Sequence, residues 1–202
     1  AEPRWVSLAL TLPEVDEAWV AGFAQGFLAL ADFYNVELVG GDMTRGPLSI
    51  TVSIKGIVPE RSALLRSDAV FVTGQLGDAA LALQQLLARQ PVSPEYLLKR
   101  LEQPEPRILA GMALRGLASS CLDLSDGLGL DLPRLADASR CGFVVEAAAV
   151  PVDEAARAVA RDEAEALGWA LAGGEDYELL FAVAPEDAAA TRRALARVGG
   201  AL

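Results

Sequence analysis

The sequence predicts an α/β fold in which strands and helices are arranged in layers. Strand-like and helix-like segments alternate along the chain, and 52% of the residues are hydrophobic, which supplies a substantial core. The length of 202 residues suffices for one large domain or two small ones. In folds of this class, ligands are expected where strands end.

The first part of the chain shows a strand, a helix and two further strands. Residues 5–11 alternate loosely between apolar and polar side chains, which indicates a strand. Pro13 and the acidic residues after it are typical of a helix start, so we expect a helix over residues 13–34. The following elements are then a short strand at 36–39, a tight turn at 40–42 and a clearly alternating strand at 48–58.

Residues 60–68 are predicted to be a connector, and beyond them apolar strand patterns again alternate with Ala/Leu-rich helical patterns. The expected strands are 70–74, 122–124, 143–147 and 178–183. The expected helices are 78–89, a short one among the prolines of 91–106, then 108–118, 128–139 (despite Pro133), 153–166 and 185–198. A glycine-rich turn at 173–177 leads into the last strand.

Charge and composition exclude several classes of function. The formal net charge is −11, from 28 acidic and 17 basic residues, and no basic cluster of the kind that binds nucleic acid is present. Phosphate ligands stay possible if metal ions carry the positive charge. The chain has no histidine, which excludes Ser-His-Asp hydrolysis, imidazole acid–base chemistry and most transition-metal sites.

We expect a cytoplasmic protein without a membrane partner. No apolar run reaches the length of a membrane span without an interrupting charge or glycine. The N-terminus carries neither a signal peptide pattern nor an initiator Met, so we expect that the chain begins inside a longer protein.

The most informative motif is the stretch Cys121-Leu122-Asp123-Leu124-Ser125-Asp126-Gly127-Leu128. Two carboxylates held about 4 Å apart repel by roughly 4 kcal/mol at an effective dielectric near 20. A cation between Asp123 and Asp126 would remove this repulsion, and oxygen ligands beside a glycine turn suit Mg²⁺. Half of a magnesium–nucleotide site is therefore one interpretation. The alternative is a helix start with Ser125 or Asp126 as N-cap, and both can hold, because helix N-termini also bind phosphate.

Two further glycine-rich motifs are candidates for the same chemistry. In Gly40-Gly41-Asp42-Met43-Thr44-Arg45-Gly46, the glycines would admit a phosphate, with Asp42 binding a metal and Arg45 a phosphate or carboxylate; the alternative is a hairpin turn in which Asp42 caps local N–H groups. In Gly173-Gly174-Glu175-Asp176-Tyr177-Glu178, three acids follow a glycine turn; the alternative is a solvated acidic loop.

Nucleotide binding would have to proceed without a Walker A loop. The chain has two lysines, Lys55 and Lys99, and neither follows a glycine-rich turn. Arg66, in the connector, is a further candidate for a phosphate contact, although a solvated arginine is the alternative.

Taken together and in this order, the three motifs resemble those of the thiamine-monophosphate kinase family, and Leu8-Ala9-Leu10-Thr11-Leu12-Pro13 also fits. The resemblance covers essentially the whole chain. It implies the two-domain fold of the aminoimidazole-ribonucleotide-synthetase-like superfamily, with an N-terminal α+β domain that dimerises (residues 1–59), a connector (60–68) and a C-terminal α/β domain (69–202). The implied reaction is Mg²⁺-dependent transfer of the γ-phosphate of ATP to thiamine monophosphate.

The resemblance also implies roles for single residues. Asp42, Asp123 and Asp126 match residues that bind Mg²⁺ in similar kinases, and Glu175 matches a residue that contacts the thiamine substrate. The residues that match ATP contacts are Gly41, Arg66 and Ser125, with Asp42 also part of the nucleotide site. The implied partners are ATP and thiamine monophosphate, with a homodimer as the assembly.

The chain departs from the family pattern at both ends. The family carries further metal-binding acids in an N-terminal segment, and none precedes Ala1 here; the chain also ends at Leu202, before the C-terminal strands of the family. We therefore expect a fold truncated at both ends. The alternatives are another ATP-using synthetase of the superfamily, against which the Gly-Gly-Glu-Asp-Tyr-Glu motif argues, and a non-catalytic ATP-binding or dimerisation fragment.

Overall fold

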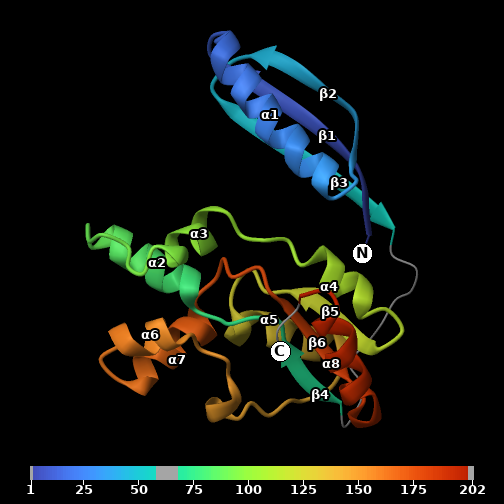
Figure 1. Cartoon of the computed structure of the whole chain (residues 1–202), viewed down its shortest axis with the longest axis vertical. Coiled ribbons are helices and arrows are strands. Elements are labelled where there is room, and N and C mark those ends of the chain that lie inside the picture. The colour runs from blue at the N-terminus through green and yellow to red at the C-terminus, as the bar shows by residue number, and fades with distance from the viewer. Residues whose placement is uncertain (1, 58–67, 200–202) are drawn as a thin grey trace. The chain divides into compact units, whose positions relative to one another are not determined.

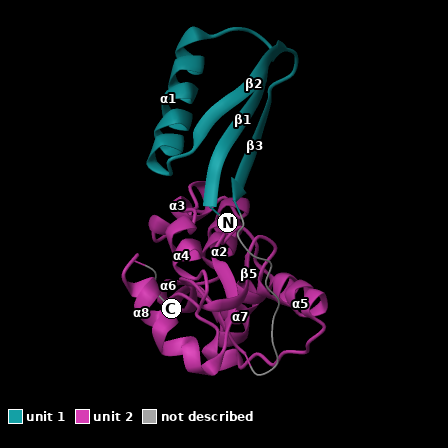
Figure 2. Cartoon of the chain, turned by 90° about the vertical axis from the view of Figure 1, so that its right-hand side faces the viewer, with its two compact units in different colours: residues 1–61 teal, residues 62–202 magenta. Residues whose placement is uncertain are grey.

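The computed structural model describes residues 2–57 and 68–199. The chain forms two compact units, residues 1–61 and 62–202, coloured separately in Figure 2. Each unit mixes helices and strands, as the predicted fold class requires. Among the described residues, no helix is both long and apolar enough to cross a membrane.

The first unit is a three-stranded sheet with one long helix (Figure 1). The central strand β1 (Glu2–Leu12) pairs in parallel with β2 (Glu37–Arg45) and antiparallel with β3 (Ser49–Ile57). Helix α1 (Glu17–Phe33) forms the crossover between the parallel strands. It begins later than predicted, because Asp16 is its N-cap and accepts hydrogen bonds from the N–H groups of Ala18 and Trp19 at 3.0 and 3.1 Å.

The turn predicted at Gly40 and Gly41 is wrong. Strand β2 continues through both glycines without a turn. It has a bulge at Val39, because Val6 of β1 pairs with Leu38 whereas Ser7 pairs with Gly40. A Cβ on Gly41 would lie 1.9 Å from the carbonyl oxygen of Leu8, so only glycine fits against β1 here. The glycines thus permit close strand packing rather than a reversal of the chain.

The first unit buries few of its own apolar side chains. Among residues 2–57, the buried apolar ones are Val6, Leu10 and Leu12, all on β1. Every residue of β2 and β3 is exposed. The exposed large apolar residues of these two strands are Leu38, Val39, Met43, Ile50, Val52, Ile54 and Ile57. Such an extended apolar surface is unusual for a part that faces water on its own.

The second unit contains an antiparallel sheet in the order β4-β6-β5, with helices in the connections. Its strands are β4 (Ala69–Val72), β5 (Ala118–Asp123) and β6 (Leu179–Val183). Its α-helices are α2 (Asp78–Leu87), α3 (Tyr96–Glu102), α4 (Ile108–Ala113), α5 (Leu128–Ser139), α6 (Glu154–Val159), α7 (Glu163–Ala172) and α8 (Ala188–Ala196), with short 3₁₀ turns at Ala147–Ala149 and Pro185–Asp187.

Several predicted elements of this unit differ from the structure. The strand predicted over 122–124 runs from Ala118 to Asp123, and the helix predicted over 185–198 is a 3₁₀ turn followed by α8. Residues 143–147 form no strand, because their apolar side chains find no pairing partner in the described sheet. The helix predicted over 108–118 ends at Ala113, and β5 begins already at Ala118. The helix predicted over 153–166 is two helices, because Ala160 has an extended backbone and Asp162 caps a new start at Glu163.

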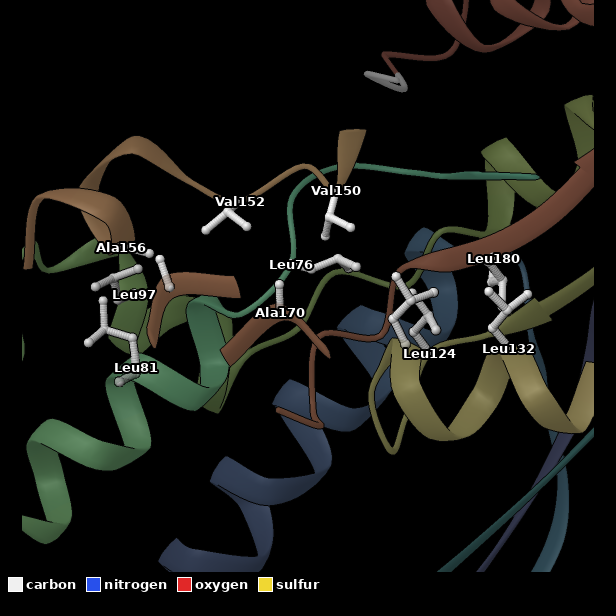
Figure 3. Close-up of a cluster of buried hydrophobic side chains, with 13 residues drawn as sticks. Leu76, Leu81, Leu97, Leu124, Leu132, Val150, Val152, Ala156, Ala170 and Leu180 are labelled. Carbon is white, nitrogen blue, oxygen red and sulfur yellow. The ribbon is translucent and has the colours of Figure 1, made fainter. Parts of the chain in front are cut away.

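The main core of the second unit lies directly beneath the predicted magnesium motif. Leu124 of that motif is 1% exposed and belongs to a cluster with Leu128 and Leu132 of α5 and Leu180 of β6. Figure 3 shows Leu124, Leu132 and Leu180 together at one end of this cluster. Burying Leu124 fixes the backbone of the motif and leaves its polar neighbours at the surface.

Candidate functional site

The candidate site is built on the short loop between β5 and α5. Asp123 is the last residue of β5, and α5 begins at Leu128. Between them Leu124 points into the core, whereas Asp123 and Asp126 are exposed. The loop therefore presents two carboxylates where a strand ends and a helix begins, which is where the sequence predicts a ligand.

A buried carboxylate that the motif search did not single out fixes this loop. Oδ2 of Asp131, which is 1% exposed, accepts hydrogen bonds from the N–H groups of Ser125 at 3.0 Å and Asp126 at 2.9 Å. Arg134 pairs with Asp131 at 2.8 Å and also with Asp126. The signal for Asp131 was its place in the first turn of α5, from which a carboxylate can reach back to free N–H groups.

The capping alternative for Ser125 and Asp126 is wrong. The N-cap of α5 is Gly127, and no side-chain cap bond is formed there. The carboxylate of Asp126 lies at the surface instead, 46% exposed and beside Arg134. Since Asp131 satisfies the loop amides, neither Asp123 nor Asp126 is needed as a cap; the carboxylate of Asp126 pairs with Arg134 and accepts a hydrogen bond from the hydroxyl of Ser125 at 3.4 Å.

The backbone of residues 173–178 is hydrogen-bonded to the backbone of the β5–α5 loop. The N–H of Glu175 donates to the carbonyl of Ser125 at 3.0 Å, and the N–H of Tyr177 donates to the carbonyl of Leu124 at 2.9 Å. The N–H of Leu124 in turn donates to the carbonyl of Glu178 at 2.8 Å. A Cβ on Gly174 would lie 2.5 Å from the carbonyl oxygen of Ser125, so glycine is required for this approach.

These bonds bring three of the predicted acids into one electrostatic neighbourhood. The hydroxyl of Tyr177 donates to Oε2 of Glu175 at 3.1 Å. Burial raises the pKa of Tyr177, and the hydrogen bond to Glu175 and the charges of Glu175, Asp123 and Asp126 raise it further. The acidic loop is therefore not simply solvated. Tyr177 is bonded to Glu175 and is also affected by the charges of Asp123 and Asp126 on the β5–α5 loop.

The other two acids of the 173–178 loop point into the protein. Asp176 is 5% exposed, and its Oδ2 accepts from the N–H of Gly77 at the start of α2 at 3.0 Å. Burial raises the pKa of Asp176 to about 6, although the N–H groups of Gly77 and Ala79 oppose this.

Glu178 is fully buried in a network of donors. It accepts from the hydroxyl of Thr73 at 2.6 Å, from Arg100 at 2.7 Å, and from Nε and Nη2 of Arg107 at 2.8 and 2.7 Å. Burial raises the pKa of Glu178, but the hydrogen bonds from Arg107, Thr73 and Arg100 outweigh it and hold the pKa below its usual value. Nothing in the motif by itself indicated that one of its acids faces outward and the other two face inward.

The remaining candidate residues are carried by other parts of the chain. Gly41 and Asp42 lie on β2 of the first unit. Asp42 is exposed, and its Oδ1 accepts the N–H of Met43 at 2.9 Å, so the predicted local N–H contact is present, within a strand rather than a turn. Arg45 ends the same strand and is exposed. Arg66 lies outside the described residues.

The donor set fits Mg²⁺ bound jointly with phosphate. In the part of the chain that the structure describes, no three carboxylate or thiol side chains are close enough to hold a metal by themselves. Asp123 and Asp126 offer oxygen ligands only and are exposed, and Mg²⁺ commonly takes one or two protein carboxylates while waters and substrate phosphates complete its coordination.

A pocket elsewhere in the second unit is not lined by the predicted site residues. It encloses about 1030 Å³ and is lined by β4, by Arg140 and by apolar residues such as Phe143 and Val145. None of Asp123, Ser125, Asp126 and Glu175 lines it. The converging motifs, rather than this pocket, therefore define the candidate site.

Two family models match the chain end to end. Residues 1–58 match the N-terminal domain of the AIR synthase related proteins, and residues 66–201 match their C-terminal domain. The curated thiamine-monophosphate kinase of Salmonella typhimurium is 47% identical over 98% of this chain and 64% of its own length. The chain thus spans somewhat less than two thirds of that relative.

Solved structures agree in fold and in sequence. The thiamine-monophosphate kinase of Stenotrophomonas maltophilia K279a has a TM-score of 0.90 and 36% identity, covering 100% of this chain and 67% of that one. A structure described as AaThiL complexed with AMPPCP and TMP has a TM-score of 0.78 and 29% identity, covering 92% of this chain and 63% of that one. The chain therefore belongs to the AIR synthase related protein family, and within it to the thiamine-monophosphate kinases.

Proposed function

We propose that the intact protein transfers the γ-phosphate of ATP to thiamine monophosphate with Mg²⁺, which gives thiamine diphosphate. Family membership and the AaThiL complex with AMPPCP and TMP support the two substrates. The observation that carries the proposal is the backbone pairing of Glu175 with Ser125, because it joins the proposed thiamine contact to the proposed metal and nucleotide contacts within one unit.

In this proposal the carboxylates of Asp42, Asp123 and Asp126 bind Mg²⁺. Ser125, Gly41 and Arg66 contact ATP, and Glu175 contacts the thiamine substrate. Bound Mg²⁺ would neutralise the charge on the phosphates and so allow two anions to approach. The chain itself holds the Asp123–Asp126 loop in place through Asp131, and this preorganisation costs nothing when the substrates bind.

The acceptor explains why the chain needs no histidine. A phosphate monoester carries about −1.5 to −2 charges at neutral pH, so thiamine monophosphate is already an anionic nucleophile. No strong general base is then required, and the remaining barrier is the repulsion between the two substrates. Phosphoryl transfer of this kind depends mainly on positioning and charge neutralisation.

The test is turnover by the intact protein. Purified protein, ATP and Mg²⁺ are incubated with thiamine monophosphate, and thiamine diphosphate is quantified by chromatography. The proposal expects product with Mg²⁺ and none with EDTA. Turnover only with a different acceptor would favour another ATP-using member of the superfamily. Nucleotide binding without turnover of any acceptor would favour a non-catalytic module.

We further propose that the protein is a cytoplasmic homodimer whose subunits meet through the first unit. The apolar residues of β2 and β3 are exposed there, and a second copy of the sheet is an occupant of matching chemistry. Sedimentation velocity of the intact protein should show a dimer, and Val52→Lys together with Ile54→Glu should shift it towards monomer. A wild-type monomer at micromolar concentration would contradict this proposal.

A further inference from the structure

In the motif Glu175-Asp176-Tyr177-Glu178, outward-facing side chains alternate with buried ones. Glu175 is exposed and Tyr177 is partly exposed, whereas Asp176 and Glu178 are 5% and 0% exposed. The outward pair lies in the electrostatic neighbourhood of Asp123. The inward pair makes its side-chain bonds to Thr73, Gly77, Arg100 and Arg107 of the second unit.

The loop is held in an unfavourable backbone conformation. Glu175 and Tyr177 have φ angles of 71° and 50°, in the left-handed region that residues other than glycine rarely adopt. Strained conformations persist only where the surroundings enforce them, and they gather at functional sites. The observed φ values therefore call for anchors that hold the residues on either side.

Asp176 and Glu178 provide those anchors. Asp176 lies between the two strained residues, and its carboxylate is fixed by the N–H of Gly77, where a negative charge is also favoured by the dipole of α2. Glu178 follows Tyr177 and is fixed by a two-pronged contact with Arg107 and by Arg100 and Thr73. A Cβ on Gly74 would lie 2.4 Å from Oε1 of Glu178, so this carboxylate is closely enclosed.

We propose that Asp176 and Glu178 are positioning residues, which hold Glu175 in the strained conformation that presents it to the phosphate acceptor. This inference rests on the proposed function, because that function assigns the acceptor contact to Glu175. Neither anchor touches the substrate. Each acts through Glu175, so its removal should impair acceptor binding and leave nucleotide binding unaffected.

The first experiment measures KM for both substrates in the intact protein. Asp176→Ala, which loses the Gly77 bond, should raise KM for thiamine monophosphate at least about fivefold without changing KM for ATP. Asp176→Asn keeps an acceptor oxygen and should restore most of the loss. Arg107→Ala tests the second anchor in the same way, and it leaves Glu178 with Thr73 and Arg100 as partners.

The second experiment repeats these substitutions in a Glu175→Ala background. If the anchors act through Glu175, their removal should then have no further effect on KM, because the group they position is absent. A purely structural role would give additive effects and would overturn the proposal. The matched control is Asp162→Ala, which removes a similar helix-terminal acceptor at α7 (bonded to the N–H of Glu165 at 2.9 Å) and should leave both KM values unchanged.

A third readout does not depend on activity. The N–H groups of Glu175 and Tyr177 are bonded to Ser125 and Leu124, and their hydrogen exchange should accelerate at least about fivefold in Asp176→Ala, with exchange in α5 unchanged. Unchanged exchange at both amides would overturn the inference even if the protein proves to have no kinase activity. Kinase activity with additive double variants would overturn the inference and leave the proposed function standing.

Discussion

The N–H of Glu175 donates a hydrogen bond to the carbonyl oxygen of Ser125 across 3.0 Å. This bond joins two loops that each carry acidic residues and a glycine turn. A substitution that pushes the two backbones apart should therefore disturb ligand binding at both loops, whereas removal of one side chain should affect its own ligand.

Gly174→Ala should force the two loops apart. The new Cβ would lie 2.5 Å from the carbonyl oxygen of Ser125, which is backbone and cannot turn away. We expect a loss of about 1–3 kcal/mol in the free energy of unfolding, measured by urea denaturation, and weaker binding of both substrates. The matched control is Gly168→Ala within α7, where a Cβ meets nothing within 4 Å and should be neutral or slightly stabilising. Equal stability of the two variants would contradict the packing described here.

Asp123→Asn and Asp126→Asn should each lower kcat about 100-fold or more in the intact protein. Each removes a charge that would balance Mg²⁺ at the phosphates, and losing one preorganised electrostatic group typically costs this much. Steady-state kinetics at saturating Mg²⁺ provide the measurement. Asp137→Asn, which changes an exposed acid in the last turn of α5, should remain close to wild type. Wild-type rates in both Asp123→Asn and Asp126→Asn would exclude them as metal ligands.

Glu175→Ala should weaken binding of the phosphate acceptor more than binding of the nucleotide. Glu175 is exposed beside Tyr177 and is the proposed thiamine contact, so KM for thiamine monophosphate should rise about tenfold while KM for ATP stays within about twofold. Substrate titrations of the intact protein separate the two values. Glu186→Ala, at an exposed site in the turn before α8, is the control. If both KM values rose together, Glu175 would not be specific to the acceptor.

Asp131→Ala should loosen the Asp123–Asp126 loop. The variant leaves the N–H groups of Ser125 and Asp126 without the carboxylate that satisfies them, and each lost charged hydrogen bond is worth about 1.5–3 kcal/mol. We expect lower stability and weaker Mg²⁺–nucleotide binding by calorimetry. Asp131→Asn retains an acceptor oxygen and should recover part of both. Undiminished binding in Asp131→Ala would show that the loop needs no such support.

Stability should depend on pH through Asp176. Its pKa is raised mainly by burial to about 6, whereas an unfolded aspartate titrates near 3.9. Between roughly pH 4 and 6 the folded state therefore holds a proton that the unfolded state has released, so this group's contribution to stability is complete at low pH and is lost as pH rises to about 6. The pKa of Asp78 is raised to about 6 by burial and by the charge of Asp153, so Asp78 changes the pH dependence of stability in the same direction. Glu178, with its lowered pKa, contributes stability that is lost as pH falls below its unfolded value.

Asp176→Asn should remove part of this dependence. The free energy of unfolding, measured by urea denaturation from pH 4 to 7, should fall less steeply with pH in the variant, by up to about 1.4 kcal/mol per pH unit. Carboxyl NMR should place the titration midpoint of Asp176 well above 4. An identical pH profile in wild type and variant would show that Asp176 titrates normally.

Local sequence patterns predicted most elements of this fold. The strand at β1, the crossover helix α1 and the helix α5 follow from apolar periodicity, and α5 spans residues 128–139 as predicted. The incorrect predictions concern segments whose structure depends on whether they pair with another strand. Gly40 and Gly41 have the composition of a turn but are extended because β1 pairs with β2 through them, and residues 143–147 have the composition of a strand but lack a partner.

For the candidate site, the motifs predicted the outward-facing acids but not their supports. Asp126 and Glu175 each stand beside a glycine in a short loop, and Asp123 ends the strand just before the first of these loops, which are local signals. Asp131 carried a local signal in its first-turn position, whereas the role of Glu178 became recognisable only when the fold brought its donors within hydrogen-bond distance, as with Arg107, which is far from Glu178 in sequence. Such contacts depend on tertiary structure and leave no local pattern.

The central proposal is that the carboxylates of Asp123 and Asp126 hold Mg²⁺ against the phosphates of ATP. The most direct measurement is a difference electron density map of the intact protein crystallised with Mg²⁺ and a non-hydrolysable ATP analogue. We expect Mg²⁺ at about 2.1 Å from oxygens of Asp123 and Asp126, with the nucleotide phosphates on the same ions. A nucleotide bound elsewhere, with no cation near either aspartate, would contradict the account.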